Sequence, residues 1–529
     1  MKKKIYFFAA FLLIISIAVV SLFLLKKKQY NLIIFTLDTT RADYIDTGNG
    51  ALSATPNIKS IAEKSTVFTH AYTISPITAP AHVSLFTGKY PYKTNVYNNG
   101  EKYDHKHPTL QQLLKKKGYK TGAVVSLGVL HKKFGLSKYF DHYNDDFRGF
   151  IPGYFLPAHT VTERSLSLLN KVKNDKFFVW LHYSDPHDPY APPEYNIPVK
   201  VKFNNSCAYT YNLYHILRVS TKMTLKKGNN ILSFDHQKLP SRFKQNPIRL
   251  DKFIIKDTKG NPIKNITYKN AQLHPKKPTI LLNSNTKIMI YSECPKTAIL
   301  EFESSPEYIN SSIEKNFYKE EVEYMDKEIG KILDYLRKNQ LLKNTVIAFI
   351  GDHGEGLGEY QSHFGHIHFL NPQYIKIPFI IYFPNEQAKR IDTNVSILDF
   401  MPTLLKHFNI KKRQKIDFDG KIVSKIKKDR PLFSFTYKPE AFNNAVSLIF
   451  NSKQYIVYRG LKNYDEFFDL EKTNGYSKND NFIHKKEYMN IIERMKKACL
   501  QQLETAKRRK SRGKIHEKTK EILKSLGYF

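Results

Sequence analysis

The chain contains 529 residues, and 84 lysines and arginines against 48 aspartates and glutamates give it a formal net charge of +36. Hydrophobic residues make up 41% of the sequence and aromatic residues 13%, which excludes an intrinsically disordered or fibrous chain. Only one segment is apolar enough to cross a bilayer, so a channel or transporter with several spans is excluded. Three cysteines are too few for a disulfide-built scaffold, and the length predicts two to four domains.

Residues 1–28 are predicted to form an N-terminal membrane anchor. Ile5–Leu25 carries no charge, and at about 1.5 Å per residue it spans roughly 30 Å of hydrocarbon. The run ends at Lys26–Lys28 rather than at small residues, which favours an uncleaved anchor over a signal peptide. Lysines flank both ends, so the positive-inside rule indicates the orientation only weakly. We expect a single-pass protein of the cell (inner or cytoplasmic) membrane, with the catalytic domain outside the cytoplasm.

Three apolar runs end abruptly in acid or imidazole groups, within the segments Asn31–Asp38, Phe177–Tyr190 and Thr345–Tyr360. Such runs are typical of strands buried on both faces. Helical patterns lie between them, at Thr109–Tyr119 and Glu320–Asn339. The alternation predicts an α/β domain over residues 29–195 and 313–410, with a mostly parallel sheet sandwiched by helices. Ligands bind beyond the carboxyl ends of such strands, where these polar groups are expected to converge.

Residues 196–312 have a different pattern, with short β-rich runs separated by turns that contain glycine, asparagine and proline. This pattern predicts an inserted β-sandwich. Cys207 and Cys294 lie in it, and the sequence leaves open whether they form one disulfide or an unpaired, buried pair. Residues 411–529 predict a small C-terminal α+β region with a basic helical tail.

The high positive charge raises the question of nucleic-acid binding, because lysine and arginine release counterions from a phosphate backbone. Lysine is instead spread along the whole chain without a recognition motif, which favours a protein that stays soluble near anionic envelope polymers. We therefore expect no nucleic-acid partner. The sequence gives no indication of the oligomeric state.

Four polar features are placed to meet in one crevice: Asp38, Thr78, the loop Asp185–His187, and Asp352-His353 followed by His366. Each also has an ordinary structural interpretation, since a strand-end acid often caps a helix and a histidine is usually a satisfied core or surface group. Together, carboxylates, an imidazole and a hydroxyl suit a divalent metal ion. Zinc or manganese is favoured, with calcium or magnesium as alternatives.

Thr78 begins a predicted helix with Pro80 in its first turn. A bound cation would lower the pKa of the Thr78 hydroxyl and make it a nucleophile. The first amides of the helix would face an incoming anion, which favours a phosphate, phosphonate or sulfate ester as substrate. His82 lies one helical turn later on the same face, and we expect it to hydrogen-bond the substrate or product oxygen.

The motif order LDTTRADYI, TPNIKSIA, ITAPAHVSLFTGKYP, LHYSDPHDPYAPP, GDHGEGLGEY and ILDFMPTLL resembles the sulfatase family of the alkaline phosphatase superfamily. The resemblance covers about residues 31–196 and 314–408 and implies an alkaline-phosphatase-like fold. It implies that Asp38, Asp352 and His353 are metal ligands and that Thr78 is the nucleophile. By the same resemblance His187 faces the ester group, and His366 matches the histidine that follows the Asp-His pair in this subgroup. A second cation held by Asp185, His187 and His366 is the weaker alternative.

One departure from the family pattern bears on the chemistry. The family's C/S-x-P-x-R motif yields formylglycine, but this chain has Thr78-Ala79-Pro80-Ala81-His82, and threonine cannot be converted to formylglycine. Threonine serves as the nucleophile in lipoteichoic acid synthases, phosphoethanolamine transferases and nucleotide pyrophosphatases of the superfamily, which act on phosphorus.

The resemblance therefore implies a membrane-anchored hydrolase or transferase acting on a phosphate or sulfate ester of an envelope glycan, lipid or polymer. A phosphorus substrate is favoured. The alternatives are an arylsulfatase-like sulfuric ester hydrolase and an inactive, sulfatase-shaped module that binds a glycan or protein.

Overall fold

The computed structural model describes residues 30–506, apart from residues 49, 148–154, 189, 191, 194–197, 213–216, 237–247, 274–278, 307–310, 411–415, 427–429, 438–443 and 460–463. The predicted anchor, Ile5–Leu25, lies outside the described residues. Among the helices that are described, none combines the length and the apolar character needed to cross a membrane.

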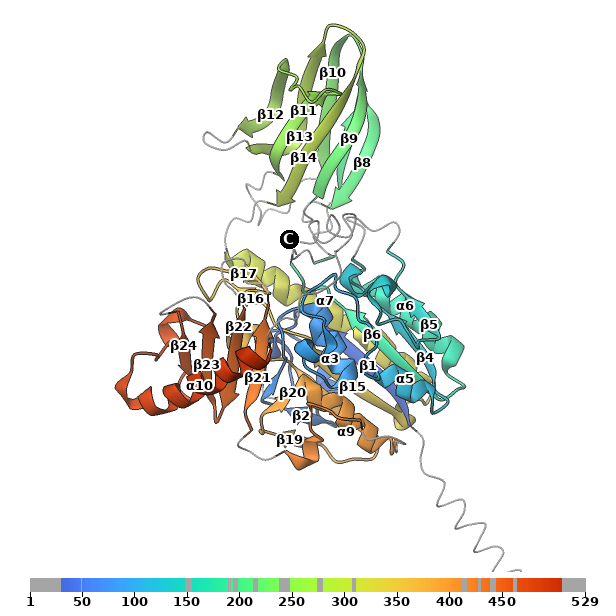
Figure 1. Ribbon diagram of the computed structural model, residues 1–529. Helices are drawn as coiled ribbons and strands as arrows, with labels where there is room; N and C mark the ends of the chain where they lie inside the picture. Colours follow the sequence, from blue (N-terminus) through green and yellow to red (C-terminus); the bar gives the residue numbers. More distant parts are fainter. Residues whose placement is uncertain are drawn as a thin grey trace, which may run out of the picture.

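An eight-stranded sheet forms the centre of the α/β body, with the order β19-β2-β18-β15-β1-β6-β4-β5 (Figure 1). Its strands are β1 (Asn31–Leu37), β2 (Thr66–Phe68), β4 (Lys120–Val124), β5 (His142–Asn144), β6 (Phe177–Tyr183), β15 (Thr345–Gly351), β18 (Phe379–Tyr382) and β19 (Lys389–Ile391). Only β18 runs antiparallel to its neighbours in this sheet, and the other pairs are parallel. Every residue of β1, β6 and β15 is buried, as expected for strands that are covered on both faces.

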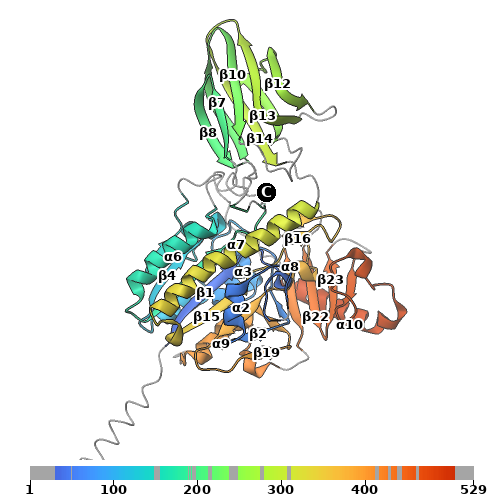
Figure 2. The same ribbon diagram turned by 180° about the vertical axis from the view of Figure 1, so that it is seen from behind.

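Helices cover both faces of this sheet (Figures 1 and 2). One layer contains α2 (Pro56–Ala62), α6 (Ala158–Val172) and α7 (Ser311–Lys338), and the other contains α3 (Thr78–Thr87), α5 (Leu110–Lys115) and α9 (Phe400–His407). The apolar stripe predicted on α7 is fully buried, comprising Val322, Met325, Ile329, Ile332, Leu333 and Leu336. The α/β class with a mostly parallel, helix-covered sheet is therefore confirmed.

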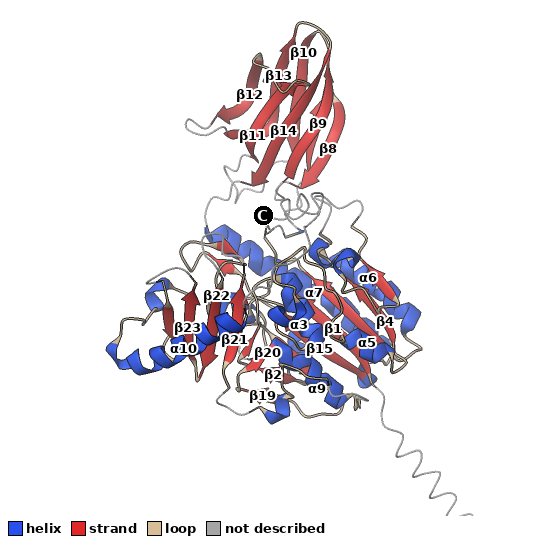
Figure 3. Cartoon of the chain, in the orientation of Figure 1, coloured by secondary structure: helices blue, strands red, loops and turns tan. Residues whose placement is uncertain are grey.

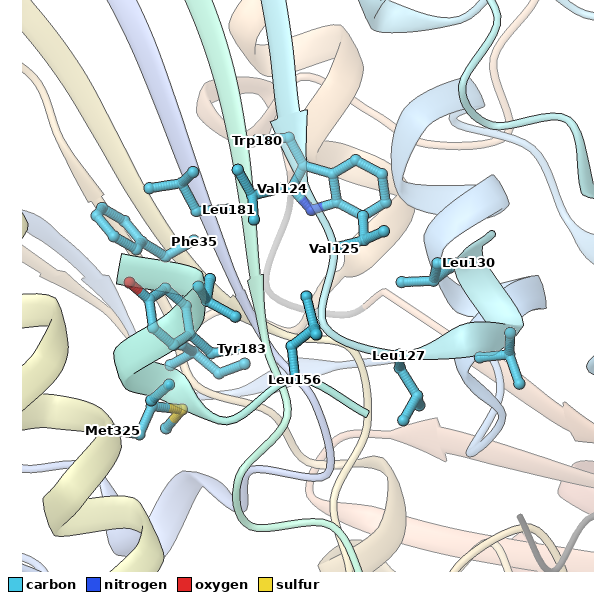
Figure 4. Close-up of a cluster of buried hydrophobic side chains, with 14 of the residues drawn as sticks. Phe35, Val124, Val125, Leu127, Leu130, Leu156, Trp180, Leu181, Tyr183 and Met325 are labelled. Atoms are coloured by element: carbon cyan, nitrogen blue, oxygen red, sulfur yellow. The ribbon is translucent and has the colours of Figure 1, made fainter. Parts of the chain in front are cut away.

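Side chains on β6 alternate between the two layers. Phe178 and Trp180 contact Phe86 of α3, and the Trp180 and Phe86 ring centroids are 4.8 Å apart. Tyr183 points to the opposite layer, where its hydroxyl hydrogen-bonds Thr162 of α6 at 2.8 Å. Figure 4 shows Tyr183 beside Met325 of α7, while Trp180 points away from them. This alternation also sets which residues of β6 face the α3 side, where the polar site lies.

The insert between β6 and α7 is antiparallel and stands apart from the α/β body, and Figure 3 shows only strands in its described part. Its strands are β7 (Pro198–Phe203), β8 (Ser206–Asn212), β9 (Leu217–Leu225), β10 (Gly228–His236), β11 (Ile248–Asp257), β12 (Ile266–Leu273), β13 (Thr279–Ser292) and β14 (Lys296–Pro306). The long strand β13 pairs with β11 through residues 279–282 and with β10 through residues 286–292.

The predicted β-sandwich is thus one hydrogen-bonded sheet that branches at β13, because this strand is shared by both halves. The two branches touch, with the Phe234 and Phe302 ring centroids 5.7 Å apart. Neither Cys207 nor Cys294 is part of a disulfide, and both are exposed, so the structure contains neither the disulfide nor the buried pair.

The C-terminal region contains an antiparallel sheet of β21 (Leu432–Thr436), β22 (Ala445–Phe450), β23 (Lys453–Tyr458) and β24 (Glu466–Asp469). Helix α10 (Met489–Thr505) packs on this sheet through Ile492, Met495, Cys499 and Leu503, which share one face of the helix. The described residues thus include the expected α+β region. The remaining short elements are α4 (Pro91–Thr94), α8 (Pro372–Ile375), β3 (Ala71–Tyr72), β16 (Gly356–Leu357), β17 (Phe364–Gly365) and β20 (Val395–Ser396).

Candidate functional site

The carboxyl ends of two adjacent parallel strands bring three predicted ligands together. Leu37 of β1 pairs with Gly351 of β15, so Asp38 and the pair Asp352-His353 leave the sheet side by side. One ligand atom from each of Asp38, Asp352 and His353 lies within 4.8 Å of the other two. All three side chains are fully buried.

The donor atoms of this cluster are chemically free to bind a cation. Asp38 Oδ1 and Asp352 Oδ2 are buried oxygens without a hydrogen-bond partner in the described structure. Asp352 Oδ1 is already used, because it accepts the backbone N–H groups of Thr39 at 3.2 Å and His353 at 2.8 Å. His353 Nδ1 donates to the Gly354 carbonyl at 3.0 Å, which leaves the Nε2 lone pair available. Two carboxylate oxygens and one imidazole nitrogen fit a divalent cation such as zinc or manganese.

The pKa values in this cluster follow from burial and from the proximity of like charges. Burial, and then the Asp38 charge, hold the pKa of Asp352 well above its usual range. Burial also acts to raise the pKa of Asp38, but the hydrogen bond with His182 and the neighbouring imidazoles outweigh it and hold this pKa well below its usual range. Burial lowers the pKa of His353 to about 4, so its imidazole is in the neutral form that binds metals.

Thr78 lies at this cluster because α3 begins there. Its side chain is fully buried, and Thr78 Oγ1 is 3.3 Å from His353 Nε2. The expectation that several amides of α3 face an anion is wrong. The Ala79 N–H donates to Asn99 Oδ1 at 2.8 Å, and Pro80 has no N–H.

His82 lies between α3 and the sheet, and its Nδ1 is 3.6 Å from Asp352 Oδ2. Its Nδ1 donates to the Thr78 carbonyl at 2.8 Å, and the ring packs against Trp180 and His182 with centroid distances of 5.4 and 5.0 Å. The side chain is fully buried, and burial lowers its pKa to about 3. His82 faces the sheet because a residue four positions after Thr78 lies on the same inward face of α3.

His187 and His366 form a row of rings that continues from His353. The His353 and His366 ring centroids are 4.5 Å apart, and those of His366 and His187 are 4.9 Å apart. His366 Nδ1 lies 3.3 Å from both carboxyl oxygens of Glu355, which is fully buried. Burial raises the pKa of Glu355 and lowers that of His366, so the neutral forms of both groups are favoured.

Asp185 has a structural role instead of joining His187 and His366 as a second cation site. Its Oδ1 accepts the backbone N–H of Ala158 at 2.8 Å, at the start of α6. Burial raises its pKa to about 7. Among the described residues, the cluster of Asp38, Asp352 and His353 is the one that gathers three ligand atoms, so the second site is not formed there.

Sequence reasoning missed His182, Ser126, Ser184, Glu355 and Asn99, which support the predicted groups. His182 Nε2 is 3.0 Å from Asp38 Oδ2. Two of them could have been found in the sequence. His182 is a polar residue inside the apolar run of β6, and Glu355 belongs to the GDHGEGLGEY motif.

This fold and this site define a class of metal-dependent ester hydrolases built on a mostly parallel sheet. A family profile described as Sulfatase matches residues 30–410, on both sides of the insert and including it. The chain belongs to the sulfatase family.

Curated relatives agree with this assignment. The chain is 25% identical to the choline-sulfatase of Rhizobium meliloti over 386 residues, covering 71% of this chain and 66% of the relative. It is 21% identical to the N-acetylglucosamine-6-O-sulfatase of Bacteroides thetaiotaomicron over 404 residues, covering 72% and 68%. The chain thus spans about two thirds of the length of these relatives.

The phosphonate monoester hydrolase SpPMH from Silicibacter pomeroyi has a similar structure, with a TM-score of 0.58 and 15% identity over 90% of this chain and 96% of that one. This similarity confirms the predicted alkaline-phosphatase-like fold.

Proposed function

We propose that the chain is a divalent-metal-dependent hydrolase or phosphotransferase that attacks a phosphate ester through Thr78. The observation that carries the proposal is the position of Thr78 Oγ1, 3.3 Å from His353 Nε2, which belongs to the Asp38, Asp352 and His353 cluster and is itself 3.5 Å from Asp352 Oδ2. Threonine cannot be oxidised to formylglycine, so its own hydroxyl has to provide the nucleophilic oxygen.

A divalent cation bound by Asp38, Asp352 and His353 would supply positive charge that lowers the pKa of the Thr78 hydroxyl. Thr78 releases its hydroxyl proton to solvent, and Oγ1 forms a bond to phosphorus while the bond from phosphorus to the leaving oxygen breaks. The leaving oxygen takes a proton from His187 in its imidazolium form, which lies next to His366 at the end of the row that begins at His353. In hydrolysis, water attacks the phosphorus of the threonine ester and restores Thr78. In a transferase, an acceptor hydroxyl takes the place of water.

Sulfate ester hydrolysis is the second candidate, and the names of the curated relatives favour it. Choline-sulfatase and N-acetylglucosamine-6-O-sulfatase are both named as sulfatases. The fold occurs in sulfatases and phosphonate monoester hydrolases alike, so it does not separate the two chemistries. An inactive binding module is disfavoured because all three donor groups and the hydroxyl are present together.

We further propose that Ile5–Leu25 anchors the protein in the cell membrane and that the catalytic domain acts outside the cytoplasm, on an envelope glycan, lipid or polymer. The support is the uncharged length of this segment and the lysines at both of its ends.

The test compares Thr78→Ala, Thr78→Ser and the wild-type protein on paired aryl phosphodiester and aryl sulfate substrates. We expect Thr78→Ala to lower kcat by about 10³-fold or more, and Thr78→Ser to keep part of the activity because it retains a hydroxyl. Thr87→Ala is the matched control, since Thr87 lies at the other end of α3 and donates to the Val83 carbonyl.

Unchanged turnover by Thr78→Ala would remove threonine from the mechanism. Turnover of the sulfate ester alone would favour the second candidate. A metal-loaded wild-type protein that turns over neither ester would favour the binding module.

A further inference from the structure

A line of buried hydrogen bonds crosses three neighbouring strands behind Asp38. Ser126 follows β4, His182 lies in β6 and Ser184 follows β6. Ser184 Oγ is 2.6 Å from Ser126 Oγ, Ser126 Oγ is 2.7 Å from His182 Nδ1, and His182 Nε2 is 3.0 Å from Asp38 Oδ2. All four side chains are fully buried. Burying these polar groups among apolar strands costs free energy of desolvation unless each group has a hydrogen-bond partner.

The backbone fixes the direction of this line. The amide nitrogen of Ser126 lies 3.4 Å from His182 Nδ1, and an amide N–H can only donate. His182 Nδ1 is therefore an acceptor, and the ring proton is on Nε2, where it points at Asp38 Oδ2. Ser126 then donates its hydroxyl hydrogen to Nδ1 and accepts one from Ser184. Every donor in the line thus points towards the carboxylate.

We propose that His182 is a positioning residue that holds Asp38 for metal binding through one oxygen, and that Ser126 fixes the tautomer of His182. The hydrogen bond to Oδ2 leaves Oδ1 as the oxygen without a partner, and it therefore assigns Oδ1 to the cation. Without the His182 N–H, the carboxylate is free to rotate about its Cβ–Cγ bond or to offer both oxygens. This inference rests on the proposed metal centre formed by Asp38, Asp352 and His353.

The test measures manganese and zinc affinity by chelator competition on His182→Phe, His182→Gln and Ser126→Ala. Phenylalanine keeps the ring volume but removes the donor, and we expect a loss of metal affinity of about 10- to 100-fold. Glutamine places an N–H close to the position of Nε2, so His182→Gln is expected to recover most of the affinity. Ser126→Ala is expected to lose less than His182→Phe, because the Ser126 amide still holds Nδ1 as an acceptor.

The electron paramagnetic resonance spectrum of bound manganese gives a readout that a purely structural role would not change. We expect the zero-field splitting to differ between His182→Phe and the wild type because the Asp38 ligation changes. His142→Phe is the matched control, since His142 is exposed on the edge strand β5 of the same sheet, and it should keep the wild-type affinity and spectrum.

The outcomes separate this inference from the proposed function. A wild-type protein that binds neither cation would overturn the metal centre itself. A wild-type protein that binds manganese, with His182→Phe equal to it in affinity and spectrum, would overturn the positioning role and leave the metal centre in place. If His182→Phe does not fold, His182→Leu replaces it as the variant without a donor. Equal losses of metal affinity in folded His182→Leu and His182→Gln would also overturn the positioning role.

Discussion

Replacement of Gly354 by alanine should displace the loop that carries two of the three metal ligands. A Cβ at Gly354 would lie 2.0 Å from the Gln373 carbonyl oxygen, about 1 Å inside the 3.0 Å limit for such contacts. The contact is with backbone, so a side-chain rotation cannot relieve it. The segment has to move away from Gln373, and the neighbouring Asp352 and His353 move with it.

The size of the effect follows from the bonds that this movement breaks. The Gly354 N–H donates to the Tyr374 carbonyl at 2.9 Å and the Glu355 N–H donates to the Gln373 carbonyl at 3.1 Å. Their loss costs about 1 kcal/mol each, and crowding in a packed interior costs about 1–3 kcal/mol. We therefore expect Gly354→Ala to lower the free energy of unfolding by about 3–5 kcal/mol and to weaken metal binding.

Gly420→Ala is the matched control for this experiment. A Cβ at Gly420 would lie 2.0 Å from the Leu398 carbonyl oxygen, as close as the Cβ at Gly354 lies to its neighbour. Gly420 is beside the carboxyl end of α3, where its N–H contacts the Gly88 carbonyl, and is away from the metal centre. Denaturant unfolding should show a similar loss of stability in both variants, and chelator competition should show weaker metal binding in Gly354→Ala alone. Wild-type metal affinity in a folded Gly354→Ala protein would refute the argument.

Three other perturbations give separate tests. Asp352→Asn should lower the metal content of the purified protein because it removes a charged ligand, and full occupancy would exclude Asp352 as a ligand. Chelation should lower Tm reversibly, since a cation at about a hundredfold excess over its Kd stabilises by about 2.7 kcal/mol, and an unchanged Tm would contradict this. Arg430→Met should cost about 3–5 kcal/mol in denaturant unfolding, because it leaves the buried Asp399 carboxylate without its ion-pair partner. A loss below about 1 kcal/mol would show that the Ser396 and Lys421 amides satisfy Asp399 alone.

The fold and the centre of the site were predictable because both depend on local patterns. Apolar runs that end in an acid identify strands buried on both faces, and the carboxyl ends of adjacent parallel strands meet at one edge. This reasoning placed Asp38, Asp352 and His353 together, as the structure does.

The roles of the supporting residues could not be predicted, because they depend on contacts between distant segments. Whether His82 faces the substrate or the sheet depends on how α3 is rotated against Trp180. Asp185 follows a buried strand like Asp38 does, yet its oxygen is used by the first amide of α6. The branching of the inserted sheet depends on the pairing of β13 with three strands, β10, β11 and β12, which no local pattern encodes.

The insert also has a bearing on how this protein can change over generations. The chain leaves the α/β body after β6 and returns to it at α7, and no strand of the central sheet of that body is interrupted. Evolution can therefore change the length or sequence of the insert as one unit without moving Asp38 and Asp352 at the ends of β1 and β15. A lineage can alter what surrounds the reaction without having to reinvent the reaction itself.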